Sequence, residues 1–144
     1  MSKQKVIICH SINENLADAI SQCTYDKLFI LVDEHTRKLC IPLIKEAGFM
    51  KDAQLICIGA EDVHKNLDTL AYVWKQLGDR GATRHSLLVN LGGGMVTDLG
   101  GFAASTFKRG IKYINVPTTL LAMVDASVGG KTGINFNGLK NEIG

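Results

Sequence analysis

Two glycine-rich stretches in the last third of the chain hold residue types that bind phosphorylated or polyhydroxylated ligands. The first is Gly92-Gly93-Gly94, followed by Thr97 and Asp98, and the second starts at Asp125 and continues through 129–133 with Lys131 inside it. Glycine lets a backbone approach a bulky anion, and the Lys, Thr and Asp side chains supply charge, donors and an acceptor. The sequence therefore predicts a ligand site here, with the rest of the chain as its scaffold.

The second stretch contains Gly130-Lys131-Thr132, which is part of the phosphate-binding P-loop pattern. That pattern needs a glycine at position 125, where Asp125 stands, and a strand directly before it. A carboxylate at this point repels phosphates. The sequence therefore disfavours a P-loop nucleotide hydrolase.

The first stretch, Gly92-x-Gly94-x-x-Thr97, is close to the dinucleotide fingerprint, with threonine in place of the third glycine. It follows the fourth apolar run of the chain rather than the first, where the ordinary fingerprint lies. The backbone N–H groups of residues 94–97 are expected at the positive start of a helix, aimed at an anion. A nucleotide is thus expected to bind through backbone N–H groups at a helix start, as in the ordinary fold, but at a different strand of the sheet.

Further polar residues follow two other apolar runs. Asp33 comes after the second run, and Glu61, Asp62 and Lys65 come after the third. Open parallel sheets collect ligands at the carboxyl ends of their strands, where a carboxylate accepts from ribose hydroxyls. A carboxylate in this place is equally typical of a helix cap, so both interpretations of Asp33 stay open.

Strand-like and helix-like segments alternate along the chain. Short apolar runs typical of strands buried on both faces lie at 6–9, 28–32, 55–58, 87–91 and 113–116. Helical patterns lie at 67–77 with Gly78 as a stop, at 35–47 with Pro42 as either a kink or the first turn of a shorter helix, and at 95–107, with a helical turn at 118–124. This order predicts a Rossmann-like open, mostly parallel α/β sheet with helices on both faces.

Size and composition agree with one globular domain, since the chain has 144 residues and 46% apolar content. The net charge of +2 and the scattered Lys and Arg residues predict no nucleic-acid partner. No apolar run approaches the roughly 20 residues of a membrane span, and no secretory signal is evident, so we expect a cytoplasmic protein. The four cysteines are widely spaced and are expected to pack in the core.

The order of these motifs resembles the 3-dehydroquinate synthase family of the shikimate pathway, densely from 91 to 144 and more loosely before. Related metal-dependent alcohol dehydrogenases share the glycine triplet and a Pro-Thr-Thr, but not the run 125–133. The positions that match are Gly92-Gly93-Gly94 with Asp98, Phe102-Ala103-Ala104, Arg109-Gly110, the run 116–122, the run 125–133, and Gly138 with Lys140 and Asn141.

The resemblance implies that 1–144 is the N-terminal NAD-binding domain of a two-domain homodimeric enzyme. In the family, a helical C-terminal domain holds a catalytic zinc or cobalt ion through a glutamate and two histidines, so no metal ligands are expected in this chain. The implied reaction takes a phosphorylated sugar acid, 3-deoxy-arabino-heptulosonate 7-phosphate, to 3-dehydroquinate and phosphate. It uses transient oxidation by NAD, elimination, reduction and ring closure, which is a lyase reaction of chorismate and aromatic amino-acid biosynthesis. The 144 residues alone are expected to be inactive.

Family site residues carry over to matching positions in this sequence. Two positions depart from the family: Asp62 stands where a glutamate is usual, with Glu61 beside it, and Thr97 stands where many members have glycine. The nucleotide contacts fall on Asp33, Asp62, Lys65, Gly94, Met95, Val96, Thr97, Asp98, Thr118, Thr119, Leu121, Lys131 and Lys140. The catalytic and substrate-side contacts fall on Asp125, Lys131, Lys140 and Asn141, with Arg109 reaching a phosphate in the neighbouring subunit's site.

Two other functions stay open from the sequence. One is a sister sugar-phosphate cyclase, which applies the same cofactor chemistry to a different phosphorylated sugar. The other is a stand-alone nucleotide-binding or regulatory module. A substrate assay separates the first alternative from 3-dehydroquinate synthesis.

Overall fold

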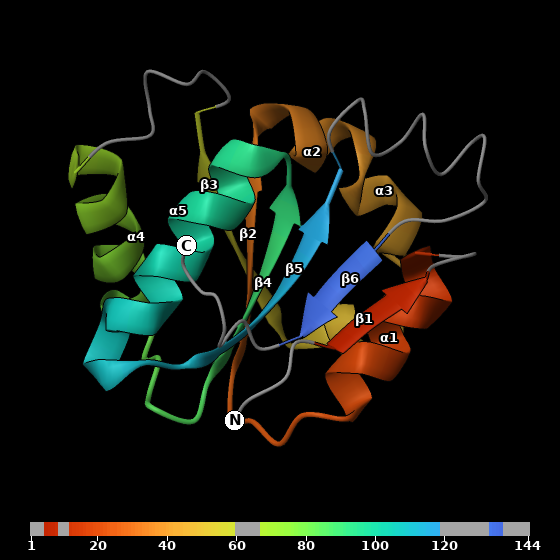
Figure 1. Ribbon diagram of the computed structural model, residues 1–144, viewed down its shortest axis with the longest axis horizontal. Helices are drawn as coiled ribbons and strands as arrows, with labels where there is room; N and C mark the ends of the chain where they lie inside the picture. Colours follow the sequence, from red (N-terminus) through yellow and green to blue (C-terminus); the bar gives the residue numbers. More distant parts are fainter. Residues whose placement is uncertain (1–4, 9–11, 60–66, 119–132, 137–144) are drawn as a thin grey trace.

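A computed structural model of the chain describes residues 5–8, 12–59, 67–118 and 133–136 and contains one six-stranded sheet (Figure 1). Two short 3₁₀ helices, Gly48–Lys51 and Phe107–Arg109, connect larger elements. These larger elements are β1 (Lys5–Ile8), α1 (Ile12–Ser21), β2 (Leu28–Asp33), α2 (Glu34–Leu39), α3 (Ile41–Ile44), β3 (Ala53–Ile58), α4 (Leu67–Asp79), β4 (Leu87–Gly92), α5 (Gly94–Thr106), β5 (Lys112–Pro117) and β6 (Gly133–Phe136).

The strand order is β1-β6-β5-β4-β2-β3. The four strands β3, β2, β4 and β5 are parallel, with Leu28 of β2 opposite both Ala53 of β3 and Leu87 of β4. Strand β6 runs antiparallel to both of its neighbours, β5 and β1. The expectation of an open, mostly parallel sheet is confirmed, whereas the antiparallel strand β6 was not foreseen from the sequence.

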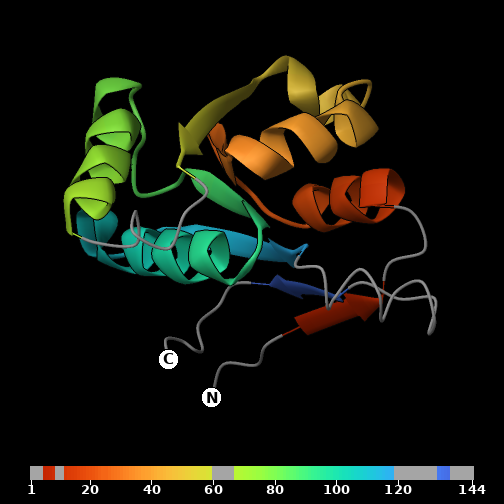
Figure 2. The ribbon, with the colours of Figure 1, turned by 90° about the horizontal axis from the view of Figure 1, so that it is seen from above.

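Helices cover both faces of the parallel strands, as expected from their mostly apolar sequences. Strand β2 is buried at all six positions, and its side chains alternate between two core layers. Phe29 and Leu31 pack in the layer beneath α4 and α5, whereas Leu28, Ile30 and Val32 pack in the layer beneath α1 and α3. Figure 2 shows the two groups of helices on opposite sides of the sheet.

The helices differ from the sequence expectations mainly at their ends. The segment 35–47 is two short helices rather than one, with Pro42 in the first turn of α3, so the second of the two alternatives is correct. Helix α4 continues past Gly78, and the chain instead turns at Gly81, whose φ of +83° suits glycine. Helix α1 was not anticipated, and the turn expected at 118–124 lies outside the described residues after Thr118.

The cysteines of the described residues lie in or beside the layer that contains α1 and α3. Cys40 is buried, Cys23 and Cys57 are half-buried, and all three are free thiols. This agrees with the expected packing role, whereas Cys9 lies outside the described residues. Within the described ranges, none of the helices combines the length and apolarity needed to cross a membrane.

Candidate functional site

The carboxyl ends of β2 and β4 form the point at which the sheet topology changes direction. The chain leaves β2 through α2 and α3 toward β3 on one face, and leaves β4 through α5 toward β5 on the other face. Because β2 and β4 are adjacent and parallel, their carboxyl ends lie together at a switch point of the kind at which open α/β sheets bind ligands. Asp33 and the glycine turn end these two strands.

The glycine turn presents an uncapped helix start at this edge. Gly93 is the N-cap residue of α5, in extended conformation, and no side chain among the described residues caps it. The N–H of Thr97 donates to the Gly93 carbonyl at 3.0 Å, so the N–H groups of Gly94, Met95 and Val96 are the ones without an intrahelical acceptor. They point outward at the positive end of a helix of 13 residues, where an anion is stabilised.

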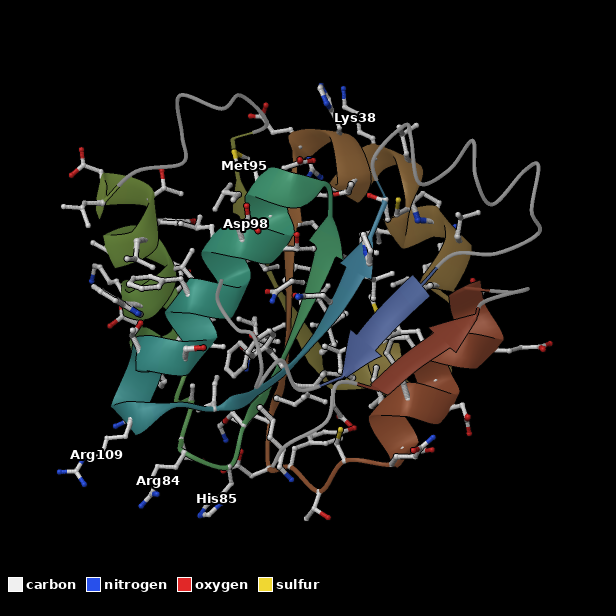
Figure 3. The ribbon with its side chains drawn as sticks, in the orientation of Figure 1. Lys38, Arg84, His85, Met95, Asp98 and Arg109 are labelled. Atoms are coloured by element: carbon white, nitrogen blue, oxygen red, sulfur yellow. The ribbon has the colours of Figure 1, made fainter. Side chains whose placement is uncertain are left out.

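The helix start limits which atoms of residues 94–97 can contact a ligand. The side chains of Met95 and Val96 pack in the core, so they can offer a ligand only their backbone N–H groups. The Thr97 amide is already engaged, and its hydroxyl donates to the carbonyls of Gly93 and Gly94 at 3.3 and 3.2 Å. Asp98 is exposed one turn further along α5 (Figure 3).

Two glycines of the turn are required for different reasons. A Cβ atom at Gly92 would lie 2.6 Å from Cγ2 of Val96, so the packing of α5 on β4 itself requires glycine there. A Cβ atom at Gly94 would meet no atom within 4 Å among the described residues. The packing of the described residues therefore gives no reason for glycine at 94, and none of them fills the space beside its Cα.

Asp33 forms a reciprocal cap at the start of α2. The Thr36 N–H donates to Asp33 Oδ1 at 2.8 Å, and the Asp33 N–H donates to Thr36 Oγ1 at 3.0 Å. The structure therefore confirms the helix-cap interpretation of Asp33. Both bonds that the cap makes to this carboxylate use Oδ1, no described residue is recorded as bonding Oδ2, and Asp33 is only 8% exposed.

Thr118 brings the end of β5 to the same edge. Its N–H donates to the Gly92 carbonyl at 2.8 Å, while its own Oγ1 is buried without a hydrogen-bond partner among the described residues. The Cys40 thiol is near this hydroxyl without forming a hydrogen bond of acceptable geometry, and burial raises the pKa of that thiol. A buried hydroxyl without a hydrogen-bond partner is costly, and a ligand bound at this edge of the sheet would supply one.

Arg109 is separated from this group. It is exposed beyond the far end of α5, whose 13 residues span about 20 Å, and Figure 3 shows it at the opposite edge from Met95 and Asp98. Lys108 and Arg109 both adopt positive φ, at 46° and 70°. The remaining predicted site residues lie outside the described part of the chain: Asp62, Lys65, Thr119, Leu121, Asp125, Lys131, Lys140 and Asn141.

Sequence reasoning missed two contributors to the site. Thr36 completes the cap on Asp33, and the spacing Asp33-x-x-Thr36 is a signal that could have revealed it. Gly93, rather than Gly94, is the residue that precedes the helix. No cluster of three or more His, Cys, Asp or Glu side chains suited to a metal ion occurs in the described ranges.

Comparison with protein families supplies the deciding observation. The family model described as 3-dehydroquinate synthase N-terminal matches residues 55–144, which include β4, α5 and the glycine turn. The chain belongs to the 3-dehydroquinate synthase family. A family relative from Parabacteroides distasonis named 3-dehydroquinate synthase is 56% identical over 144 residues, covering 100% of this chain and 41% of that relative. The chain therefore spans well under half the length of the relative it matches.

Solved structures of related cyclases share the fold. A 2-deoxy-scyllo-inosose synthase, complexed with carbaglucose-6-phosphate, NAD⁺ and Co²⁺, matches with a TM-score of 0.68 and 25% identity over 86% of this chain and 38% of that one. A 2-epi-5-epi-valiolone synthase from Streptomyces hygroscopicus, with NAD⁺ and Zn²⁺ bound, matches with a TM-score of 0.60 and 29% identity over 74% of this chain and 30% of that one. Both likenesses confirm the Rossmann-like architecture.

Proposed function

We propose that the protein is a 3-dehydroquinate synthase and that this chain supplies its NAD-binding domain. The full reaction converts 3-deoxy-arabino-heptulosonate 7-phosphate to 3-dehydroquinate and phosphate, a carbon–oxygen lyase reaction. Family membership supports the reaction, and the open helix start at Gly94 is the observation that supports the dinucleotide. Three free thiols among the described residues support a reducing, cytoplasmic location.

The described residues fit a dinucleotide in two respects. No described atom lies within 4 Å of a Cβ at Gly94, and the Thr118 hydroxyl lacks a partner among the described residues; both observations support a pyrophosphate against the N–H groups of residues 94–96. Asp33 Oδ2 would accept from ribose hydroxyls while Oδ1 keeps the cap. When bound, NAD supplies a hydride acceptor that is regenerated within one turnover. Asp62, Lys65, Thr119 and Leu121 remain proposed nucleotide contacts.

The substrate contacts are proposed from the family motif. Asp125, Lys131, Lys140 and Asn141 would hold the carboxylate, phosphate and hydroxyl groups of the sugar acid, because lysines neutralise anions and carboxylates orient hydroxyls. A divalent ion, zinc or cobalt, would be held by residues of the relatives that lie beyond the span of this chain. The small net charge of +2 supports a partner with a few anionic groups rather than a nucleic acid.

Arg109 is proposed to act in a neighbouring subunit of a homodimer. It lies about one full length of α5 from the glycine turn, too far for its own side chain to span. Two successive residues with left-handed backbone, Lys108 and Arg109, hold it outward, which is the kind of local strain that occurs at functional positions.

The alternative function is a sister cyclase acting on another phosphorylated sugar. The structural likeness to 2-deoxy-scyllo-inosose synthase favours this class, but at 25% identity, compared with 56% for the relative named 3-dehydroquinate synthase. Phosphate release by the protein at the full length of its relatives, assayed with 3-deoxy-arabino-heptulosonate 7-phosphate and with glucose 6-phosphate, separates the two. Turnover of glucose 6-phosphate alone would overturn the first proposal.

The nucleotide part of the proposal is tested by Gly94→Ala. Because no atom of the described residues lies within 4 Å of the new Cβ, we expect the free energy of unfolding to change by less than about 0.5 kcal/mol. The methyl group would fill the space in front of the amides, so we expect NAD⁺ affinity, measured by titration calorimetry, to fall by about tenfold or more.

Gly78→Ala is the matched control. Gly78 is an exposed glycine of α4, and a Cβ there would also meet no described atom within 4 Å. This variant should gain about 0.5–1 kcal/mol of stability from helix propensity and bind NAD⁺ as the parent chain does. Equal NAD⁺ affinity in the Gly94→Ala variant and its parent would show that the dinucleotide does not approach this turn.

A further inference from the structure

Asn90 is a fully buried asparagine in the middle of β4, two residues before the glycine turn. The other residues of this strand before Gly92 are apolar, and those beside Asn90, Val89 and Leu91, pack in the layer away from α5. Leu88 packs toward α5, and Asn90 shares its face because side chains alternate along a strand. Burying an amide costs free energy unless the amide is hydrogen-bonded, so the presence of Asn90 in the core requires an explanation.

The amide of Asn90 contacts two other elements. Its Nδ2 donates to Oδ1 of Asn115 at 2.9 Å, and these two residues are in register on β4 and β5. Its Oδ1 receives no hydrogen bond from an N–H or O–H donor of the described residues. A Cβ atom at Gly100 of α5 would lie 1.9 Å from that oxygen.

The Cα atom of Gly100 therefore lies in direct contact with the side-chain oxygen of Asn90. With a carbon–carbon bond of about 1.5 Å, Oδ1 lies no more than about 3.4 Å from the Gly100 Cα. That separation is the range of a Cα–H to oxygen contact, which only a residue without a side chain can make here. Gly101 adds a second close approach, since its Cβ would lie 3.3 Å from the Tyr113 ring on β5.

The third glycine of the dinucleotide fingerprint normally provides this close packing of helix on strand. Thr97 stands at that position in this chain, and the close approach occurs at Gly100 instead, almost one turn further along α5. The Asn90 amide thus fixes how near α5 lies to β4 and β5. The same helix carries the three outward N–H groups at residues 94–96.

We propose that Asn90 is a positioning residue for the nucleotide site, acting through Gly100 and α5 on the N–H groups that receive the ligand. This proposal rests on the proposed function for the nature of the ligand. It adds that the space between Asn90 and Gly100 sets the position of the helix start. Asn90 itself does not touch the nucleotide.

The test compares Gly100→Ala, Asn90→Ala and the double variant, each in the 144-residue chain. The added methyl of Gly100→Ala meets Asn90 Oδ1 and should move α5 outward, weakening NAD⁺ binding by about tenfold while the chain stays folded. Asn90→Ala in the same chain makes room for that methyl, so the double variant should recover affinity to within about threefold of the parent chain.

A second readout does not depend on the nucleotide. The backbone amide resonances of residues 94–96, measured without ligand, should shift in Gly100→Ala and return toward the parent values in the double variant. If Gly100→Ala fails to fold, Asn90→Ala alone still tests the proposal, because it removes the contact without adding volume and should also shift these resonances.

The outcomes separate the two proposals. If Gly100→Ala shows the resonance shifts but the parent chain binds no NAD⁺, the proposed ligand is overturned and the positioning role is still supported. Variants that lose stability with unchanged resonances and unchanged NAD⁺ affinity show that Asn90 only packs the core. A double variant that recovers neither resonances nor affinity also overturns the positioning role.

Discussion

Substitution of Asp33 separates its structural role from its proposed role toward the nucleotide. Asn is as good as Asp at an N-cap, and Asp33→Asn keeps an oxygen that can accept from the Thr36 N–H at 2.8 Å. The free energy of unfolding should therefore change by less than about 0.5 kcal/mol. Asp33→Ala leaves the buried Thr36 N–H without its acceptor and should cost about 1–2 kcal/mol.

Ligand affinity should respond differently to the same two substitutions. A carboxylate oxygen that accepts from ribose hydroxyls contributes about 1.5–3 kcal/mol, and an amide presents hydrogens on one side where the carboxylate had an acceptor. Both Asp33→Asn and Asp33→Ala should therefore weaken NAD⁺ binding by about ten- to a hundredfold. The expected pattern is one stable and one destabilised variant, with both impaired in binding.

Urea unfolding followed by the fluorescence of Trp74, the chain's single tryptophan, gives the stabilities, and calorimetric titration gives the affinities. Trp74 suits the purpose because it packs against the core, and its Nε1 donates to Thr106 Oγ1 at 3.1 Å. If Asp33→Asn bound NAD⁺ as the parent chain does, Asp33 would be only a cap. If Asp33→Asn were as unstable as Asp33→Ala, the cap would depend on the charge, contrary to the reasoning above.

Two further predictions concern the opposite edge of the sheet. Asp26 accepts hydrogen bonds from the Thr83 and Ser86 hydroxyls, which lower its pKa below the ordinary value of 3.8. The stability that these bonds provide is present above the ordinary pKa and is lost as the pH falls through the lowered pKa. The urea midpoint should therefore drop between about pH 5 and about pH 2 more in the parent chain than in Asp26→Asn. Lys108 has φ 46° and ψ 42°, so Lys108→Gly should raise stability by up to about 1 kcal/mol whereas Lys108→Ala should not, and a less stable glycine variant would contradict the presence of strain.

The parallel part of the fold was predictable because burial of a strand on both faces produces a run of consecutive apolar residues. A strand covered on both faces is mostly apolar; β2 is apolar up to Asp33, and β4 is apolar up to Gly92 except at Asn90. The antiparallel strand β6 has no such signal, since its register is set by the neighbours β5 and β1 rather than by its own four residues. Helix α1 was missed although Ile12, Leu16, Ala19 and Ile20 follow the spacing of an amphipathic helix in the sequence.

The location of the site was predictable, but which atoms of its residues can contact a ligand was not. Strand ends in a parallel sheet meet at one edge, so placing Asp33, Gly94 and Thr118 near one another needs only the strand assignments. Which atom of each residue is available depends on bonds made by its neighbours. Thr36 occupies one oxygen of Asp33, the Gly93 carbonyl occupies the Thr97 amide, and Thr118 is left with a buried hydroxyl.

The glycines show most clearly what spacing cannot reveal. Gly92, Gly94 and Gly100 are the same residue type within nine positions, yet a Cβ would strike Val96 at the first, nothing at the second and Asn90 at the third. The first and third are therefore explained by the packing of the protein, and substitution there should be felt by the chain itself. Gly94 is different because its substitution disturbs no atom of the described chain. Gly48 and Gly78 also meet no described atom, so the lack of contact does not by itself indicate a ligand. Gly94 differs from them because it begins a 13-residue α-helix, where an anion is stabilised.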